Sequence, residues 1–190
     1  MGHREDLLAG AKRCLAEKGY ARTTARDIVA ASGTNLASIG YHFGSKDALL
    51  TAAVIDWFDD WDDEIEQALH SQRDREPAER LSAFLDAVLH AATSDRALAG
   101  ASLQAAAQAE YSDELRDQLG EAYNRGRRAF AAMLLQVEES EIDDERGRAI
   151  GSLGLALVNG MVLQWLIDPE RAPSGSELAA AIRVLLTPRT

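Results

Sequence analysis

Apolar residues recur along the chain at spacings of three and four, and no stretch alternates strictly between apolar and polar positions, so the pattern predicts helices throughout. The first predicted helix covers residues 4–18, and Gly19 follows in the position of a C-terminal cap. Its apolar face is formed by Leu7, Leu8, Ala11 and Leu15.

Capping residues mark where the next helices begin. The run 24–27, Thr-Ala-Arg-Asp, has the form of a capping box and predicts a second helix from about residue 25 to Ser32-Gly33. Asn35 is expected to cap a third helix that runs to Phe43, and Ser45 a fourth. The later helices are predicted to start at Pro77, at Ser94 or Asp95, at Ser112 (reaching about residue 138), at 140–143 and at 174–177.

These patterns together predict an all-α chain of about nine helices joined by short connections. One segment suggests an alternative, because residues 149–167 carry no charge over 19 positions, which is long enough to span a membrane. Ser152, Asn159, Gln164 and three glycines interrupt this segment, so we expect a buried central helix and no membrane span. The N-terminus has no apolar run of signal-peptide length, which favours a cytoplasmic protein.

Charge is distributed unevenly over the 190 residues, whose net charge is −11. Residues 1–50 carry a net charge of +2 and the remainder −13, with seven acids in the run 56–66. A weakly basic N-terminal part could still bind a nucleic acid if only that part touched it. The single cysteine, Cys14, excludes an internal disulfide and is expected to be a buried thiol.

The second and third predicted helices fit a helix-turn-helix over about residues 24–43. Gly33 suits the left-handed turn, and Ile28 and Ile39 can pack between the helices, with the small Ala30 at their crossing. The third helix is then free to enter a major groove with its N-terminal residues first. The predicted DNA contacts are Thr24, Asn35, Leu36, Ala37, Ser38, Tyr41, His42 and Lys46.

The stretch around Gly40 needs a reason, because a mid-helix glycine costs about 1 kcal/mol relative to alanine. Close approach to a DNA phosphate would explain it, and so would close packing of another helix. Tyr41 and His42 offer a hydroxyl and a ring N–H to phosphates, although Tyr41 could also be core. Phe43 is assigned to the core. Lys46 lies in a first helical turn, where a cation is disfavoured unless a phosphate is bound.

Residues 4–50 resemble the TetR-type transcriptional repressors, most clearly in "GYARTTARDIVAASGTNLASIGYHFGSKDALL". The resemblance implies a DNA-binding domain over residues 1–50, a helical ligand-binding and dimerisation domain over 51–190, and a ligand-responsive repressor that binds a palindromic operator as a homodimer. Two positions depart from the family pattern: Thr34 stands where an apolar residue is usual, and Gly40 where an aromatic is frequent.

A pocket in the second domain is expected to bind a partly hydrophobic, neutral or cationic small molecule, because residues 51–190 are strongly acidic. Asn159 and Gln164 are the most suggestive positions, since a buried amide needs partners. An inward orientation of Arg125, Arg127 and Arg128 would instead create an anion site. The candidate lining residues are Trp57, Trp61, Phe84, Gln104, Tyr111, Tyr123, Phe130, Met133, Asn159 and Gln164.

The last two predicted helices are expected to form the dimer, since glycines at positions 147, 151 and 154 let another helix approach closely. The residues assigned to this interface are Gly151, Gly154, Leu178, Ile182, Leu185 and Leu186.

Two other classes of function stay open at this stage. A carboxylate-bridged metal enzyme would need Glu-x-x-His pairs on facing helices, and the nearest pairs are Glu66/His70 and Asp86/His90. None of the common catalytic or nucleotide-binding motifs is present, so no enzyme, metal or cofactor is predicted. A helical interaction protein that does not bind DNA is the second alternative.

Overall fold

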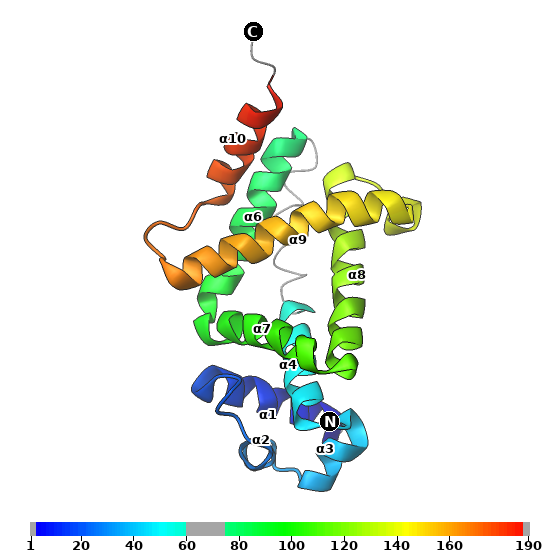
Figure 1. The fold of residues 1–190 in the computed structure, drawn as a ribbon, viewed down its shortest axis with the longest axis vertical. Helices are drawn as coiled ribbons and strands as arrows, with labels where there is room; N and C mark the ends of the chain where they lie inside the picture. Colours follow the sequence, from blue (N-terminus) through cyan, green and yellow to red (C-terminus); the bar gives the residue numbers. More distant parts are fainter. Residues whose placement is uncertain (1–2, 60–74, 188–190) are drawn as a thin grey trace. The chain divides into compact units, whose positions relative to one another are not determined.

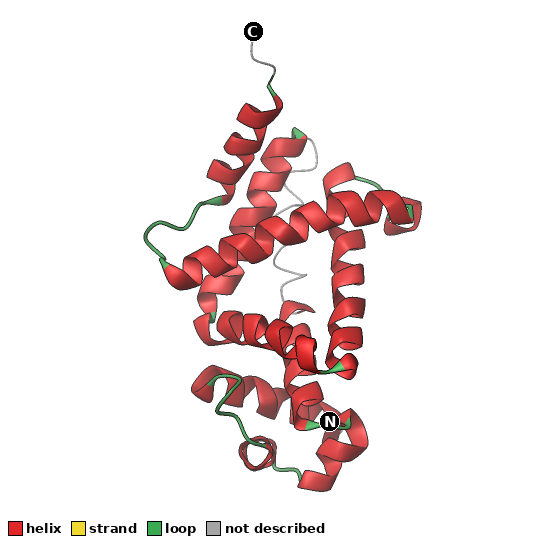
Figure 2. Cartoon of the chain, in the orientation of Figure 1, coloured by secondary structure: helices red, strands yellow, loops and turns green. Residues whose placement is uncertain are grey.

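The computed structural model describes residues 3–59 and 75–187, which hold nine α-helices and two short 3-10 helices and contain no strand (Figures 1 and 2). The all-α prediction is confirmed. The chain divides into two compact units, of which the first comprises residues 1–60 and 95–122 and the second residues 61–94 and 123–190. The first unit is thus larger than the predicted DNA-binding domain, because residues 95–122 pack with it.

The first unit is built around α1, α2, α3 and α4, with α7 packed on α1 and α4. Its core contains buried leucines and isoleucines from these helices, and Cys14 is buried too, as predicted. Burial raises the pKa of the Cys14 thiol. The elements are α1 (His3–Lys18), α2 (Ala25–Ser32), α3 (Leu36–Phe43), α4 (Lys46–Asp59), α7 (Arg96–Gln108), η1 (Ala109–Tyr111) and the start of α8 (Asp113–Leu135).

A side-chain cap begins α2 and a glycine ends it, as the sequence predicted. The Thr24 hydroxyl accepts a hydrogen bond from the Asp27 amide, while the Asp27 carboxylate accepts one from the Thr24 amide at 2.9 Å. Lys18 of α1 donates to the same carboxylate at 2.5 Å. Hydrogen bonds from Lys18 and Thr24 hold the pKa of Asp27 well below its usual range. Gly33 ends α2 with φ at 68°, a left-handed conformation that favours glycine.

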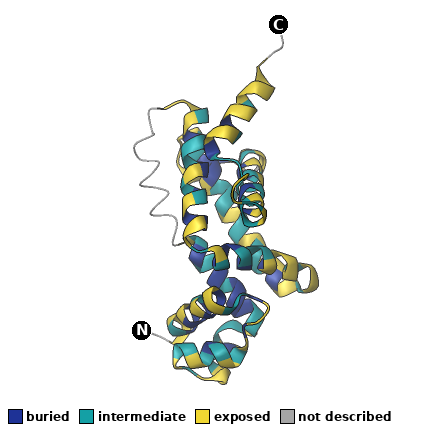
Figure 3. Ribbon diagram, turned by 90° about the vertical axis from the view of Figure 1, so that its left-hand side faces the viewer, coloured by how far each residue is buried: buried dark blue, intermediate teal, exposed yellow. Residues whose placement is uncertain are grey.

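The second unit contains α6 (Pro77–Ser94), the rest of α8 from Tyr123, η2 (Glu139–Glu141), α9 (Asp144–Ile167) and α10 (Gly175–Leu186). Its core is a cluster of buried apolar side chains from α6, α8 and α9, namely Leu81, Leu85, Phe130 and Met161. Half-buried side chains from α10 pack against this cluster, and the far end of α10 is exposed (Figure 3).

Two glycines bring α9 into close contact with α8 of the same chain. A Cβ at Gly151 would lie 2.3 Å from the backbone oxygen of Arg127, and one at Gly154 would lie 2.4 Å from the Phe130 ring. The close helix approach predicted at these glycines therefore exists. Their assignment to the dimer interface is wrong, because both are buried against α8.

Two polar contacts from α6 hold the ends of neighbouring helices. The Asp86 carboxylate accepts a hydrogen bond at 2.7 Å from the Gly175 amide, in the first turn of α10. Buried Arg80 donates to the carbonyl of Leu134 at 2.7 Å, in the last turn of α8, and also to the carbonyl of Arg75. A cation at the C-terminus of a helix and a carboxylate at an N-terminus both complement the helix dipole.

The helix boundaries differ from the predicted ones in a few places. Helix α8 ends at Leu135 rather than near residue 138, and the next residue, Gln136, has a positive φ of 58°. Asp143 caps α9, while residues 139–141 form the separate turn η2. The part of the fourth helix predicted beyond residue 59, including Trp61, lies outside the described residues.

Helix α9 is less buried than the sequence predicted. Among the described residues, Glu145–Ile167 is the one segment long and apolar enough to span a membrane by length and composition. Only 28% of its apolar window is buried, so the prediction of a buried central helix is correct for one face alone. Core helices of soluble proteins have the same length and composition, so these two properties do not by themselves favour a membrane span.

Candidate nucleic-acid interface

The α2–turn–α3 segment has the internal packing of a helix-turn-helix. Ile28 is fully buried and Ile39 is 4% exposed, which confirms that both lie in the core of this motif. Ala30, expected at the helix crossing, is exposed, so that expectation is wrong. The small residue at a close approach is instead Gly10 of α1, where a Cβ would lie 2.8 Å from the Cβ of Ser32.

One face of α3 is open to solvent and is largely apolar. Leu36 is 52% exposed and Tyr41 is 85% exposed, and Ala37 is exposed between them. Asn35 is exposed too, but its Oδ1 already accepts a hydrogen bond at 3.1 Å from the Ser38 amide and so caps the helix. Ser38 is half-buried, and its Oγ lies 3.4 Å from Nδ1 of His3.

Gly40 lies on this open face. Apart from the adjoining residues and the backbone of α3 itself, no described atom lies within 4 Å of the position that a Cβ at Gly40 would occupy. The alternative that Gly40 serves close helix packing is therefore wrong, and so is a core role for Tyr41. Phe43 is half-buried rather than core, with the Arg4 guanidinium 5.4 Å from its ring centre. The glycine leaves the α3 backbone accessible to a partner.

Besides Tyr41, two further residues, His42 and Lys46, are candidates for phosphate contacts. His42 is half-buried, with its ring edge-on to Tyr41 at 4.8 Å between centroids. The Lys46 ammonium lies 2.8 Å from the Asp47 carboxylate and 3.4 Å from the Thr23 carbonyl. Asp47 therefore offsets the unfavourable position of this cation in the first turn of α4. Thr24, the remaining candidate, is exposed at the N-terminus of α2.

About half of the proposed pocket residues lie in the second unit, where they form two groups of contacts. The rings of Phe84 and Phe130 meet edge-to-face at 4.9 Å, and Met133 packs against the same cluster. Asn159 of α9 donates a hydrogen bond to the Tyr123 hydroxyl of α8 at 3.1 Å. The hydrogen-bond partner expected for the Asn159 amide is thus the hydroxyl of Tyr123 in the same chain.

Arg127 alters the chemistry expected near Tyr123. Its guanidinium lies 5.9 Å from the Tyr123 ring centre and its Nη1 donates to Asn124 at 2.7 Å. Its Nε is buried and has no hydrogen-bond partner in the described chain. The Tyr123 ring, proposed as a surface for a cationic ligand, already carries the cation of Arg127. Of the three arginines for which an inward orientation was considered, Arg127 and Arg128 are half-buried and Arg125 is exposed.

The other proposed pocket residues lie elsewhere. Trp57 is buried in the first unit, where Gln104 and Tyr111 are exposed on α7 and η1. Gln164 is exposed on α9, so the expectation of a buried amide there is wrong. Trp61 lies outside the described residues. Apolar character and helical spacing do not show whether such a residue lies in the core, in a pocket or at an interface, because all three places favour the same residue types.

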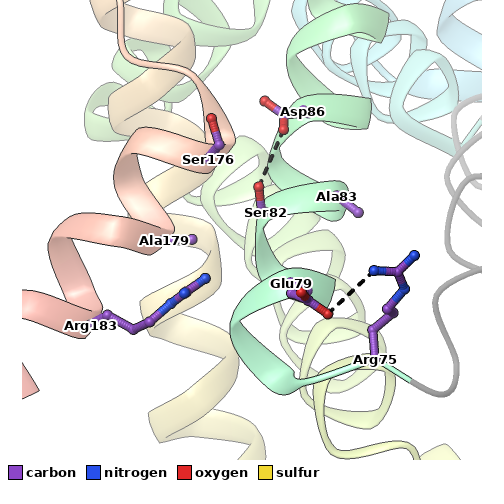
Figure 4. A pocket seen from close by; sticks show the side chains of 8 residues that line it. All are labelled: Arg75, Glu79, Ser82, Ala83, Asp86, Ser176, Ala179 and Arg183. Atoms are coloured by element: carbon purple, nitrogen blue, oxygen red, sulfur yellow. Dashed lines mark hydrogen bonds and ion pairs between the residues drawn. The ribbon is translucent and has the colours of Figure 1, made fainter.

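A groove that the sequence did not indicate lies between α6 and α10 (Figure 4). Its volume is about 300 Å³. Arg75 and Glu79 form an ion pair at 3.8 Å on one side, Arg183 lies on the other, and Ser82 bonds to Asp86 at 3.4 Å. The remaining lining residues are Ala83, Ser176 and Ala179. Opposite charges balance along the groove, so it does not select a charged ligand.

An exposed apolar stripe, which was not expected from the sequence, runs along α9. Its residues are spaced alternately by four and three positions, which is the heptad pattern of a helix–helix seam. Gly160 lies in its middle, and no described atom lies within 4 Å of the place that a Cβ would take there. The other members are exposed: Ala149, Leu153, Ala156, Leu163 and Ile167. The uncharged run 149–167 includes these residues, but a fully buried helix would have the same uncharged run. The sequence alone therefore does not distinguish an exposed stripe from a buried helix.

The dimer residues proposed on α10 divide into two groups. Leu178 and Ile182 are half-buried against the core cluster of the second unit. Leu185 and Leu186 are 83% and 78% exposed. The first pair therefore stabilises the subunit itself, and only the second pair is available to a partner.

The helices α1 to α3 form a three-helix domain, called the head below, whose third helix is exposed. This arrangement is typical of the class of helix-turn-helix DNA-binding proteins. Comparison with known proteins identifies the family. Residues 7–53 match the model of bacterial regulatory proteins of the tetR family. Residues 77–187 match the model of the C-terminal domain of BetI-type transcriptional repressors. The chain belongs to the TetR family of transcriptional regulators.

Individual relatives agree with this family. The HTH-type transcriptional repressor AcnR of Corynebacterium efficiens is 43% identical over 49 residues, which are 26% of each chain. The match thus spans about a quarter of the length of the curated relatives. A transcriptional regulator from Rhodococcus sp. Rha1 superposes with a TM-score of 0.68 at 22% identity, covering 96% of this chain and 94% of that one.

A regulator from Saccharomonospora viridis, solved in complex with choline, superposes with a TM-score of 0.65 at 23% identity, covering 96% of this chain and 94% of that chain. At this identity the likeness concerns the fold. Family membership places the chain among transcriptional regulators, a class that is not enzymatic. Of the two metal-site pairs considered, Glu66/His70 lies outside the described residues, and Asp86 holds the start of α10.

Proposed function

We propose that the protein is a ligand-responsive repressor that binds a palindromic DNA operator as a homodimer. The observation that carries the proposal is the open face of α3, where Gly40 leaves the backbone uncovered and Leu36 and Tyr41 are exposed. Residues 1–50 form the DNA-binding domain in this proposal, and residues 51–190 bind the effector and form the dimer. Such a protein works where the DNA is, in the cytoplasm.

The DNA contacts follow from the exposed groups of the head. The N-terminal turn of α3, residues 35–38, enters the major groove and contacts base edges. Tyr41, His42 and Lys46 flank it and contact phosphates, which position the helix without specifying sequence. Lys46 exchanges its pairing with Asp47 for a phosphate when DNA binds. The net charge of +2 on residues 1–50 is modest, so these few contacts carry much of the electrostatic attraction.

The apolar stripe on α9 and the exposed end of α10 support a homodimer. A stripe with heptad spacing packs against a helix of a second subunit, and Gly160 permits close approach at the crossing. Leu185 and Leu186 extend the same apolar character onto α10. In the proposed dimer a two-fold axis relates the two α3 helices, and the operator is expected to be a palindrome whose half-sites lie one turn of DNA apart, about 34–36 Å.

The effector site is proposed at the Tyr123–Asn159–Arg127 group, which lies in the same unit as the aromatic cluster of Phe84 and Phe130. Ligand sites combine apolar walls with a few oriented polar groups, as found here. The choline complex of the Saccharomonospora viridis regulator is an example of this fold with a small molecule. A partly hydrophobic effector that favours a different separation of the heads lowers operator affinity by the coupling free energy, typically about 1–3 kcal/mol.

The test is selection of bound duplexes from a randomised DNA pool, followed by anisotropy titrations of the selected sequence. We expect a palindrome, a 2:1 ratio of subunits to duplex, and affinity that falls steeply with salt. A thermal-shift screen of small molecules then seeks compounds that both raise the melting temperature and release the operator. Absence of any enriched sequence would contradict DNA recognition, whereas an operator that no stabilising ligand releases would contradict ligand response alone.

A further inference from the structure

We propose that α3 recognises its operator through the 5-methyl groups of thymine, with Leu36 as the specificity-determining side chain and Ala37 beside it. This inference rests on the proposed operator binding and names the chemistry by which the operator is chosen. Leu36 occupies the first turn of α3 and is 52% exposed, and Ala37 follows it on the open face.

The residue types on α3 leave few of the usual polar ways of distinguishing bases. Guanine is recognised by the paired donors of arginine or lysine, cytosine by a carboxylate, and adenine by the amide of asparagine or glutamine. Residues 34–45, "TNLASIGYHFGS", contain no arginine, lysine, glutamine, aspartate or glutamate. The helix that enters the groove therefore lacks all of these base-reading side chains except asparagine.

Asparagine is the one remaining candidate, and its side chain is already engaged. The Asn35 Oδ1 accepts the Ser38 amide at 3.1 Å and satisfies the N-terminus of α3. A bidentate contact with adenine needs that oxygen as acceptor together with the amide as donor. Rotating Asn35 toward a base would uncap the helix that carries it. Ser38 is half-buried, and its hydroxyl lies 3.4 Å from Nδ1 of His3, so this group also has a partner within the chain.

The apolar side chains that remain match one feature of the major groove. Thymine C5-methyl is the apolar group on the base edges there, and it contacts alkyl side chains. Gly40, one turn further along α3, has open space where a side chain would stand, so the helix can lie close to the groove. A close helix brings the Ala37 methyl and the Leu36 branch onto the base edges, and water is released from both apolar surfaces.

The experiment removes only the methyl group. In the operator obtained by selection, each thymine of one half-site is replaced in turn by deoxyuridine, which preserves every hydrogen-bonding group. Dissociation constants are measured by anisotropy at one fixed salt concentration. At one or two positions facing the start of α3 we expect binding to weaken about three- to fivefold, the value for one buried methyl group. Deoxyuridine elsewhere in the half-site should leave affinity unchanged.

A double-mutant cycle assigns the effect to Leu36. Leu36→Ala changes an exposed side chain, so the variant should fold, and it should bind the thymine operator more weakly but show little further loss with deoxyuridine. Tyr41→Phe is the matched control on the same helix and should keep the full sensitivity to deoxyuridine. Replacing the sensitive thymine by cytosine should weaken binding, and 5-methylcytosine should restore part of the loss.

The outcomes separate this inference from the proposed function. A selected operator in which no thymine is sensitive to deoxyuridine, or in which Leu36→Ala keeps the full sensitivity, overturns methyl recognition while operator binding stands. Failure to select any operator overturns the proposed function itself.

Discussion

At the scale of single residues, the head depends on polar groups that each serve more than one element. Asp27 closes the capping box of α2 through Thr24 and also binds Lys18 of α1 at 2.5 Å. The same carboxylate thus caps the start of one helix and joins two helices. Protonation of Asp27 should therefore weaken the packing of α1 against α2, the helix that precedes α3.

We predict that Asp27→Asn lowers the melting temperature at pH 7, because a neutral amide keeps the cap but loses the charge that pairs with Lys18. The folded pKa of Asp27 is depressed, so its contribution is fully present above the unfolded pKa of about 4. It is lost as the pH falls toward the lowered pKa. The difference between wild type and variant should therefore shrink in thermal melts below about pH 4. Exposed Asp117→Asn is the control, and equal pH dependence of the two variants would contradict the role of Asp27.

His42→Ala and Lys46→Ala test the phosphate contacts. Each should weaken binding to all duplexes to a similar degree, because phosphates carry no sequence information. Lys46→Ala should also lower the slope of log affinity against log salt by about 1, since one phosphate fewer is neutralised. Arg171→Ala removes a cation that is exposed in the second unit and should leave the slope unchanged. Affinities and slopes equal to those of wild type in both head variants would remove these residues from the interface.

At the scale of helices, the sequence predicted well where each helix begins, but it did not predict which helices pack against one another. The caps at Thr24, Asn35 and Ser174 all hold the helices that the sequence predicted, since a cap acts within four residues of its own position. What packs on a glycine is decided elsewhere in the chain. Gly151 and Gly154 signalled a close helix, yet nothing near them in sequence distinguishes α8 of the same chain from a helix of a partner.

The same limit applies to the candidate sites. Phe130, Met133 and Trp57 have similar apolar character, and only the fold assigns the first two to one cluster and the third to another unit. The recognition helix was easier to predict, because capping residues and a turn glycine occur there in a characteristic order along the sequence. Gln164 was mispredicted because its amide shares a helix with apolar residues, and whether that face is buried depends on a neighbour.

Gly154→Ala should destabilise the protein, because its methyl group would lie 2.4–2.6 Å from three atoms of the Phe130 ring. Such overpacking typically costs about 1–3 kcal/mol, and urea unfolding measures it. Gly120→Ala is the matched control on α8, where no described atom stands within 4 Å. That variant should be stabilised by up to about 1 kcal/mol through helix propensity. A Gly154→Ala protein as stable as wild type would show that α8 and α9 can separate without cost.

At the scale of the whole molecule, the apolar surface left open by the fold points to a second subunit. The stripe on α9 and the end of α10 together expose Leu153, Leu163, Ile167, Val184, Leu185 and Leu186, each at least 43% exposed. Patches of this kind on soluble proteins usually mark interaction sites. The second unit therefore carries both the proposed effector site and the proposed dimer surface.

Leu163→Glu combined with Leu185→Glu should convert the protein to monomers in sedimentation velocity, because two buried charges per subunit would face each other across the seam. Ile182 is unsuitable for this test, since it packs in the subunit core. Val137→Glu, at an exposed position after α8, is the control and should remain dimeric. A wild-type protein that sediments as a monomer at micromolar concentration would contradict the dimer.

The position of Cys14 has a practical consequence for studying how the head moves. It is the only thiol in the chain, it is 3% exposed inside the head, and burial disfavours its reactive thiolate. A thiol reagent therefore labels the protein only when the head opens, and the labelling rate measures that opening without any engineered probe. In the proposed function operator DNA binds the closed head, so it should slow labelling in proportion to its occupancy. One natural cysteine thus makes the opening of the head measurable in the unmodified chain.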